Sequence, residues 1–177
     1  LGINNLTIAN PLGVYLPGAI QAVNAGGVTV TDFVPDTDIT VNGVLNFVSG
    51  KLVANNGANL TTTVNGVTTY SAVPQATGTK TVTIAALGSI TGAGSTTGWV
   101  IGNLKKLTNS GARPSFSYAI GDANYYTPLA LTFAGNTNAN GGLTARTTAG
   151  DHPQLASSDL SPSISVNRTW TLTNASL

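Results

Sequence analysis

The sequence predicts an all-β protein. Apolar and polar residues alternate over 116–120 and again over 129–133, on either side of a Gly/Asp/Asn break at 121–124. This alternation is typical of two half-buried strands joined by a connection. Upstream of these strands, short segments rich in Thr, Val, Ile and Leu recur between Gly and Asn residues, and no stretch of the chain has the apolar spacing of a helix.

The composition indicates a folded chain with a weakly charged polar surface. Only 7% of the 177 residues are charged, against about 25% in typical soluble domains. Hydrophobic residues nevertheless make up 41%, so the chain can bury a core. Thr, Ser and Asn supply the polar surface, which suits a secreted, extracellular β protein.

Charge and cysteine content exclude several classes of partner. A net charge of +1 provides no field for nucleic acid or anionic lipid. The absence of cysteine excludes a disulfide framework and thiolate metal sites. No apolar run approaches the roughly 20 residues that span a bilayer, so we expect no membrane insertion. The chain begins at Leu1 and contains no Met, so we expect it to be an internal piece of a longer protein.

Residues 1–98 predict a short parallel β-solenoid-like region. In that architecture short strands stack their inward residues from one coil to the next, with Asn and Gly at the corners. The alternative is a β-sandwich built of antiparallel hairpins, which would make the whole chain β-sandwiches. Asn42-Gly43 and Asn65-Gly66 are the strongest tight-turn pairs. The expected strands are 5–8, 13–16, 28–31, 39–41, 44–47, 50–53, 59–62 and 81–84.

Residues 99–177 predict an incomplete β-sandwich. The Gly/Ser/Thr-rich stretch 88–98 reads as a connection that precedes it. Strands are expected at 116–133, at 143–147 and around Trp170. A sandwich needs about seven strands, and fewer are present here. We therefore expect its closing strands to come from outside this chain or from another chain.

Four phrases occur in order from Gly98 onward: GWVIGNLKKL, FSYAIGDANYYTPLALTF, LTARTTAGDHPQL and SVNRTWTLTN. Their order resembles a module of large, repetitive cell-surface proteins of Bacteroidetes. The phrase ITVNGVLNFVSGKLV is similar to the β-helical stretches that often lie upstream of that module. The resemblance implies an exported repeat unit of an adhesin-like or filamentous protein, with neighbouring copies or flanking modules as its partners.

Arg168 and Trp170 are the most informative structural candidates. They alternate with Thr and share one strand face with Val166 and Leu172, a face that we expect to be buried. A buried arginine needs an anionic or carbonyl partner. The acids in the adjoining loops are Asp122, Asp151 and Asp159. Alternatively, Arg168 lies at the rim and extends its charged end to solvent.

The densest acidic patch holds Asp32, Asp36 and Asp38. Calcium takes six to eight oxygen ligands, often from several carboxylates of one loop, so these are calcium candidates. Asp122 and Asp151 are secondary candidates. The sequence also fits a metal-free turn at each place. We expect no cofactor beyond a possible calcium ion.

The one histidine, His152, does not indicate an enzyme. A catalytic histidine needs a nucleophile held beside it, and Ser is too abundant here to single one out. We expect no catalytic site. The predicted function is a structural or adhesive module that builds a stalk or filament through β-strand edges. The alternative is a carbohydrate-binding module that stacks sugars on Trp99, Tyr125, Tyr126, Tyr15 or Tyr70.

Overall fold

The computed structural model describes the chain in ten stretches. These are residues 1–11, 13–16, 23–25, 28–30, 38–54, 60–64, 67–71, 80–111, 115–135 and 141–175. Most of the described residues lie in strands, and the helical residues among them are two 3-10 turns, η1 (Leu155–Ser157) and η2 (Pro162–Ile164). The prediction of an all-β protein is confirmed.

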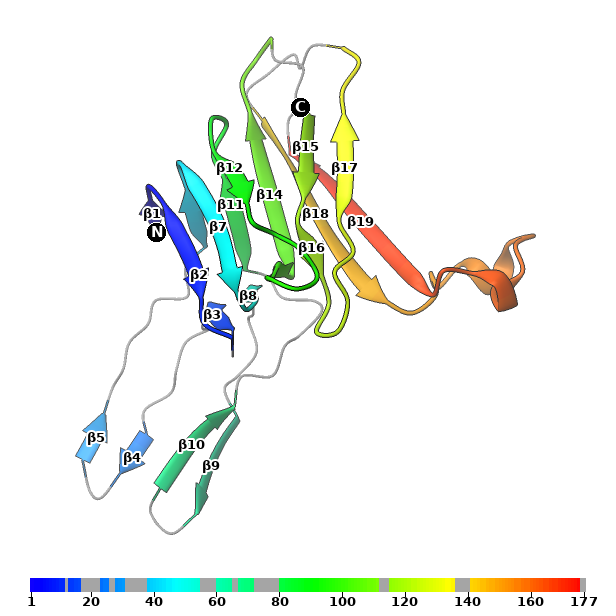
Figure 1. The fold of residues 1–177 in the computed structure, drawn as a ribbon. Coiled ribbons are helices and arrows are strands. Elements are labelled where there is room, and N and C mark those ends of the chain that lie inside the picture. The colour runs from blue at the N-terminus through cyan, green and yellow to red at the C-terminus, as the bar shows by residue number, and fades with distance from the viewer. Residues whose placement is uncertain are drawn as a thin grey trace.

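Three sheets contain strands that pair in parallel (Figure 1). The first sheet has the order β1 (Gly2–Ile3), β6 (Ile39–Val41), β11 (Thr81–Ile84), β14 (Asn103–Thr108), β18 (Gly141–Ala149) and β19 (Arg168–Ala175). The second has the order β12 (Ser89–Thr91), β7 (Val44–Ser49) and β2 (Leu6–Ala9). The third has the order β16 (Ile120–Gly121), β13 (Val100–Ile101), β8 (Leu52–Ala54) and β3 (Val14–Leu16).

The chain visits these sheets in rotation, and we call each visit to all three a circuit. The first circuit is β1, β2 and β3, the second β6, β7 and β8, and the third β11, β12 and β13. β14 and β16 then pair in parallel with β11 and β13. Equivalent strands of successive circuits are therefore neighbours within one sheet.

Inward side chains of the circuits lie in register and form one core. In the first sheet, Val82 pairs with Ile39 on one side and with Leu104 on the other. All three sheets contribute residues to this core, and the side chains of these residues are almost completely buried. They include Ile8, Val41, Leu45, Phe47, Leu52, Val82, Ile84, Val100, Leu104, Ile120 and Ala145.

Asn42-Gly43 forms a corner between two sheets, because β6 and β7 belong to different sheets. A Cβ on Gly43 would lie 2.9 Å from the carbonyl oxygen of Asn4, one circuit earlier. A Cβ on Gly88 would lie 2.9 Å from the carbonyl oxygen of Gly43. Backbones of adjacent circuits therefore touch at this corner, where only glycine leaves enough room.

Two antiparallel hairpins are inserted where the chain passes from the third sheet back to the first. β4 (Val23–Ala25) pairs with β5 (Val28–Val30), and β9 (Leu60–Val64) pairs with β10 (Val67–Ser71). The predicted turn Asn65-Gly66 falls between β9 and β10 and lies outside the described residues. In the third circuit, Gly102 alone makes the same passage from β13 to β14.

The predicted boundary between residues 98 and 99 does not interrupt the sheets. β13 pairs in parallel with β8, and β14 pairs in parallel with β11. The core likewise includes residues from both sides of this position. The described structure is thus continuous here, and the change in pairing comes later in the chain.

Within the three main sheets, antiparallel pairing begins beyond β14. β18 pairs antiparallel with β14, and β19 pairs antiparallel with β18. β15 (Ser115–Tyr118) pairs antiparallel with β17 (Leu129–Thr132), as expected from the two alternating stretches. The Tyr118 hydroxyl donates to the Leu143 carbonyl at 2.9 Å, which joins β15 to β18. Figure 1 shows β17 and β19 on the side of the molecule opposite to β1.

Within the described residues, no helix has the length and apolar character needed to cross a membrane.

Phe47 and Val48 provide a matched test of this core. Phe47 is 2% exposed and faces the core, whereas the next residue, Val48, is 55% exposed. We expect Phe47→Ala to lower the free energy of unfolding by about 3–5 kcal/mol, the usual cost of deleting a buried aromatic ring. Val48→Ala should change it by no more than about 0.5 kcal/mol. Urea denaturation measures both, and similar effects of the two substitutions would contradict the described facing of β7.

Candidate association edge and its aromatic flank

β19 forms an edge of the first sheet and carries exposed apolar side chains. It pairs with β18, and no other described strand pairs with it. Trp170 is 37% exposed and Leu172 is 45% exposed. Leu172 lies opposite the buried Ala145 in the ladder, and Trp170 lies opposite the buried Thr147. Trp170 and Leu172 therefore lie on the same face of the sheet as the buried residues of β18.

The prediction that Trp170 is a buried core anchor is wrong. Its face was assigned correctly, because opposed residues in an antiparallel pair project to the same side. Burial requires a second layer above that face, and no described strand covers Trp170 and Leu172 fully. Val166, expected on the same buried face, precedes β19 and is exposed.

One hydrogen bond links Trp170 to the opposite layer. Its indole Nε1 donates to the carbonyl of Thr127 at 3.3 Å, just before β17 begins. Leu129 and Leu131 of β17 are half-buried and pack against the core. The Trp170 hydrogen bond therefore ties β19 to the chain segment that leads into β17.

Arg168, at the start of β19, is paired with Asp122. The distance from Nη2 to Oδ2 is 2.7 Å, and both side chains are largely buried. Of the three acids expected as partners of Arg168, the structure places Asp122 beside it. The guanidinium also lies 5.8 Å from the ring centroid of Tyr125, within the range of a cation–π contact.

Asp122 organises the loop between β16 and β17. Its Oδ1 accepts the backbone N–H groups of Asn124 and Tyr125, each at 2.7 Å. Partial burial alone would raise the pKa of Asp122, but these two hydrogen bonds and the hydrogen bond and charge of Arg168 together lower it below the ordinary value. The carboxylate therefore stays ionised and holds the loop against β19.

An aromatic flank adjoins this loop. Trp99 is buried and donates from Nε1 to the carbonyl of Asp122 at 2.9 Å. Its ring lies 5.8 Å from that of Tyr126. Tyr125, by contrast, is 64% exposed. A cavity of about 270 Å³ lies next to the loop, lined by Ile101, Gly102, Gly121, Asp122, Ala123, Asn124, Thr147, Thr148 and Ala149.

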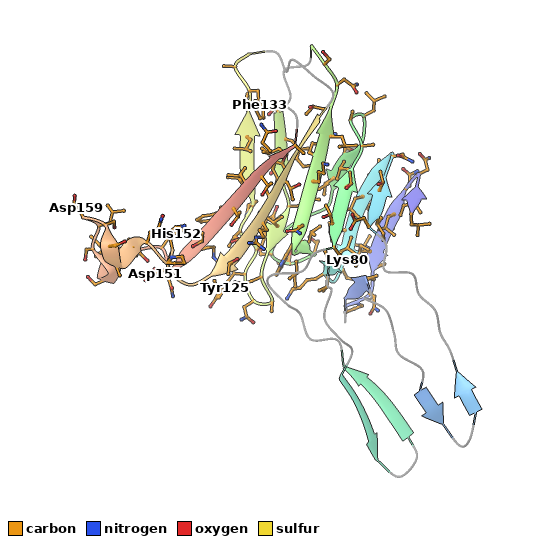
Figure 2. All side chains as sticks on the ribbon, turned by 180° about the vertical axis from the view of Figure 1, so that it is seen from behind. Lys80, Tyr125, Phe133, Asp151, His152 and Asp159 are labelled. Carbon is orange, nitrogen blue, oxygen red and sulfur yellow. The ribbon has the colours of Figure 1, made fainter. Side chains whose placement is uncertain are left out.

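Asp151, His152 and Asp159 belong to the segment between β18 and β19, residues 150–167. Figure 2 shows Asp151, His152 and Asp159 on the segment that projects from the ends of β18 and β19. Asp151 accepts a hydrogen bond from the Ser165 hydroxyl. His152 Nδ1 accepts the backbone N–H of Gln154 at 3.2 Å. These side chains fix turns of the segment.

The predicted calcium patch is only partly described. Asp32 and Asp36 lie outside the described residues, as do the side chains of Tyr15 and Tyr70. Asp38 is exposed, and its Oδ1 accepts the backbone N–H of Thr81 at 2.9 Å. Among the described residues, no three His, Cys, Asp or Glu side chains are grouped to hold a metal ion. Calcium at this patch stays a prediction.

Sequence reasoning missed two lysines that support the structure. Lys106 is buried, and its Nζ donates to the carbonyls of Ala85, Ala86 and Gly88 at 2.6, 2.9 and 2.8 Å. Burial lowers the pKa of Lys106. Lys51 donates to the Ala123 carbonyl at 2.5 Å and lies 4.4 Å from the Trp99 ring centroid. The strand alternation that places Lys106 with Leu104 was the available signal.

A scan against protein-family models, a search of curated proteins and a search of solved structures each gave no match for this chain. The resemblance to Bacteroidetes surface modules therefore stays a prediction from the sequence.

Asp122→Ala tests the role of this carboxylate. We expect it to lower the free energy of unfolding by about 2–3 kcal/mol near neutral pH, because Arg168 and two backbone N–H groups lose a charged acceptor. The pKa of Asp122 is lowered on folding, so its contribution is present above the ordinary value near 4. It is lost as the pH falls through the lower folded value.

The difference between Asp122→Ala and the parent chain should therefore shrink in denaturation curves recorded at progressively lower pH below about 4. The control is Asp159→Ala, an exposed acid on the projecting segment, whose effect should stay within about 0.5 kcal/mol. An Asp122→Ala difference that persists undiminished in acid would show that the carboxylate charge does not stabilise the loop.

Proposed function

We propose that this chain is a structural, adhesive module of an extracellular bacterial surface protein, and that it builds a stalk or filament through β-strand edges. The observation that carries the proposal is the edge of β19, where Trp170 and Leu172 are exposed on a core-facing side. Exposed apolar residues beside a strand edge to which no other described strand pairs favour addition of another strand. Neighbouring copies or flanking modules of the same protein are the proposed partners.

The fold proposed for this module combines two architectures. We infer a short parallel β-solenoid for the three circuits, supported by the parallel ladders and the shared core. We infer an incomplete β-sandwich for the antiparallel strands that follow, with β18 and β19 in one layer and β15 and β17 in the other. The Tyr118–Leu143 hydrogen bond between the layers supports this inference.

The residues of β19 lack the features that protect natural sheet edges. Such edges commonly carry lysine, proline or a bulge, which discourage pairing with other chains. β19 has the sequence RTWTLTNA, with neither Lys nor Pro, and its pairing to β18 is regular. Its one charged residue, Arg168, is held by Asp122. Main-chain hydrogen bonds at this edge would give affinity without a ligand pocket.

The alternative function is carbohydrate binding, and it is favoured by one observation. Tyr125 is exposed beside a cavity of about 270 Å³ whose lining includes Asp122, Asn124 and Thr147. An exposed aromatic ring next to polar side chains suits a sugar, which has an apolar face and hydroxyl groups. Surface glycans would be the ligands, and the module would still act outside the cell.

Assembly is tested by sedimentation velocity of the purified chain over a wide concentration range, with electron microscopy of the same samples. We expect reversible association that increases with concentration. Leu172→Lys places a charge on the apolar face of β19 and should weaken association by at least about tenfold, since an unpaired charge buried at a contact is costly. The matched control, Thr173→Lys, puts the charge on the opposite face and should associate like the parent. A chain that stays monomeric at every concentration contradicts the proposal.

Glycan arrays and calorimetry with bacterial surface polysaccharides test the alternative. If sugars bind at the aromatic flank, Tyr125→Ala should weaken binding by about tenfold or more, as expected on loss of a stacking ring. Leu87→Ala is the control, because Leu87 is exposed on a turn outside the flank. Absence of binding, or equal binding by both variants, would remove this alternative.

A further inference from the structure

The backbone groups of β19 that face away from β18 can be assigned. Gly150 N–H donates to the carbonyl of Asn167 at 3.0 Å, directly before β19 and in register with its ladder. Hydrogen-bonded and non-hydrogen-bonded pairs alternate along an antiparallel ladder. Thr169, Thr171 and Thr173 therefore bond to β18. The N–H and C=O groups of Arg168, Trp170 and Leu172 point to the other edge.

The sequence of β19 is complementary to itself around Thr171. In an antiparallel pairing of two copies centred on this residue, Trp170 of each copy lies opposite Leu172 of the other. Arg168 lies opposite Asn174, so no like charges meet. On the outer face, Thr171 faces its own counterpart and Thr169 faces Thr173. In this pairing Trp170 of one copy and Leu172 of the other form a hydrogen-bonded pair. This is possible because the backbone N–H and C=O groups of both residues point away from β18.

Other registers fit less well. A shift of two residues in one direction sets Trp170 against its own copy and leaves Leu172 opposite Arg168. The same shift in the other direction pairs Leu172 with its own copy and sets Trp170 opposite the polar Asn174. The other edge of the first sheet, β1, contains only Gly2–Ile3. It can exchange few hydrogen bonds, whereas β19 has eight residues. The length of β19 and its apolar pairs therefore favour pairing with another β19.

We propose that a second copy of this chain pairs with β19 through its own β19, antiparallel, about a two-fold axis at Thr171. This inference rests on the proposed function and names the partner strand and its register. The pairing extends the first sheet across both copies and covers Trp170 with Leu172 of the second copy. A contact of this kind is closed and symmetric. Extension of the pair into a filament then needs a second contact surface, outside β19.

Cysteine cross-linking tests the register. The chain has no cysteine, so Thr171→Cys introduces a single thiol. Thr171 and its counterpart form a non-hydrogen-bonded pair, in which the Cα atoms are about 4.5 Å apart. That separation falls within the range of about 4.4–6.8 Å that a disulfide spans. Under mild oxidation Thr171→Cys should form a covalent dimer on non-reducing gels.

The neighbouring positions serve as matched controls. Thr169→Cys and Thr173→Cys lie on the same face and strand, yet each faces the other position rather than itself. Alone, each should cross-link at least about tenfold more slowly than Thr171→Cys, because the thiols are beyond disulfide reach. An equimolar mixture of the two should form a mixed dimer readily. Circular dichroism of each reduced variant checks that the fold is retained.

The outcomes separate this inference from the proposed function. Both the register and the proposed function are supported if Thr171→Cys and the equimolar mixture cross-link rapidly while Thr169→Cys and Thr173→Cys by themselves do not. Equal cross-linking rates at the three positions overturn the register. The absence of cross-linking in a chain that still assembles also overturns it. In both cases assembly uses another edge or a flanking segment, and the proposed function stands. A chain that neither cross-links nor assembles overturns both.

Discussion

The stacking of inward side chains from one circuit to the next is the interaction on which the rest of the structure depends. Ile39, Val82 and Leu104 occupy equivalent places in three adjacent strands, and the other two sheets repeat this arrangement around the same core. No circuit is thick enough to bury its own apolar face, so each uses its neighbours as cover. The spacing of strands in the sheets in turn brings backbones into contact at the corners, where Gly43 and Gly88 lie.

This stacking constrains the strands within the sheets, whereas the length of the chain between the third sheet and the first differs from circuit to circuit. Two of the passages from the third sheet to the first carry an inserted hairpin, whereas Gly102 makes the third passage alone. Gly102 has a φ of +106°, and a Cβ there would lie 2.6 Å from the Ala54 carbonyl oxygen. The entropy of closing a loop grows slowly with its length, so long insertions at such a corner disturb the stacked strands little.

Three charged side chains, Lys106, Asp122 and Arg168, act where the parallel stack ends. Lys106 lies on the last parallel strand of the first sheet and binds three carbonyls of the turn that follows β11. Asp122 and Arg168 join the loop after β16 to the start of β19. A buried charge is costly unless hydrogen-bonded partners surround it, and each of these charges has such partners. They fix the position of the antiparallel strands, and hence of the open edge of β19.

The sequence by itself determined the all-β class, the strand faces and the low charge of the surface. Alternation of apolar and polar side chains is a local pattern, so residues 116–133 indicated their two strands. The assignment of Trp170 and Leu172 to one strand face was also right. Only the tertiary structure decided which strands are neighbours, because pairing in parallel circuits joins residues about 40 positions apart, as Val41 and Ile84 are. The continuity across residue 98 could not be read locally for the same reason. The exposure of Trp170 was also beyond the sequence, since parity assigns a side chain to a face, whereas burial depends on whether another layer covers that face.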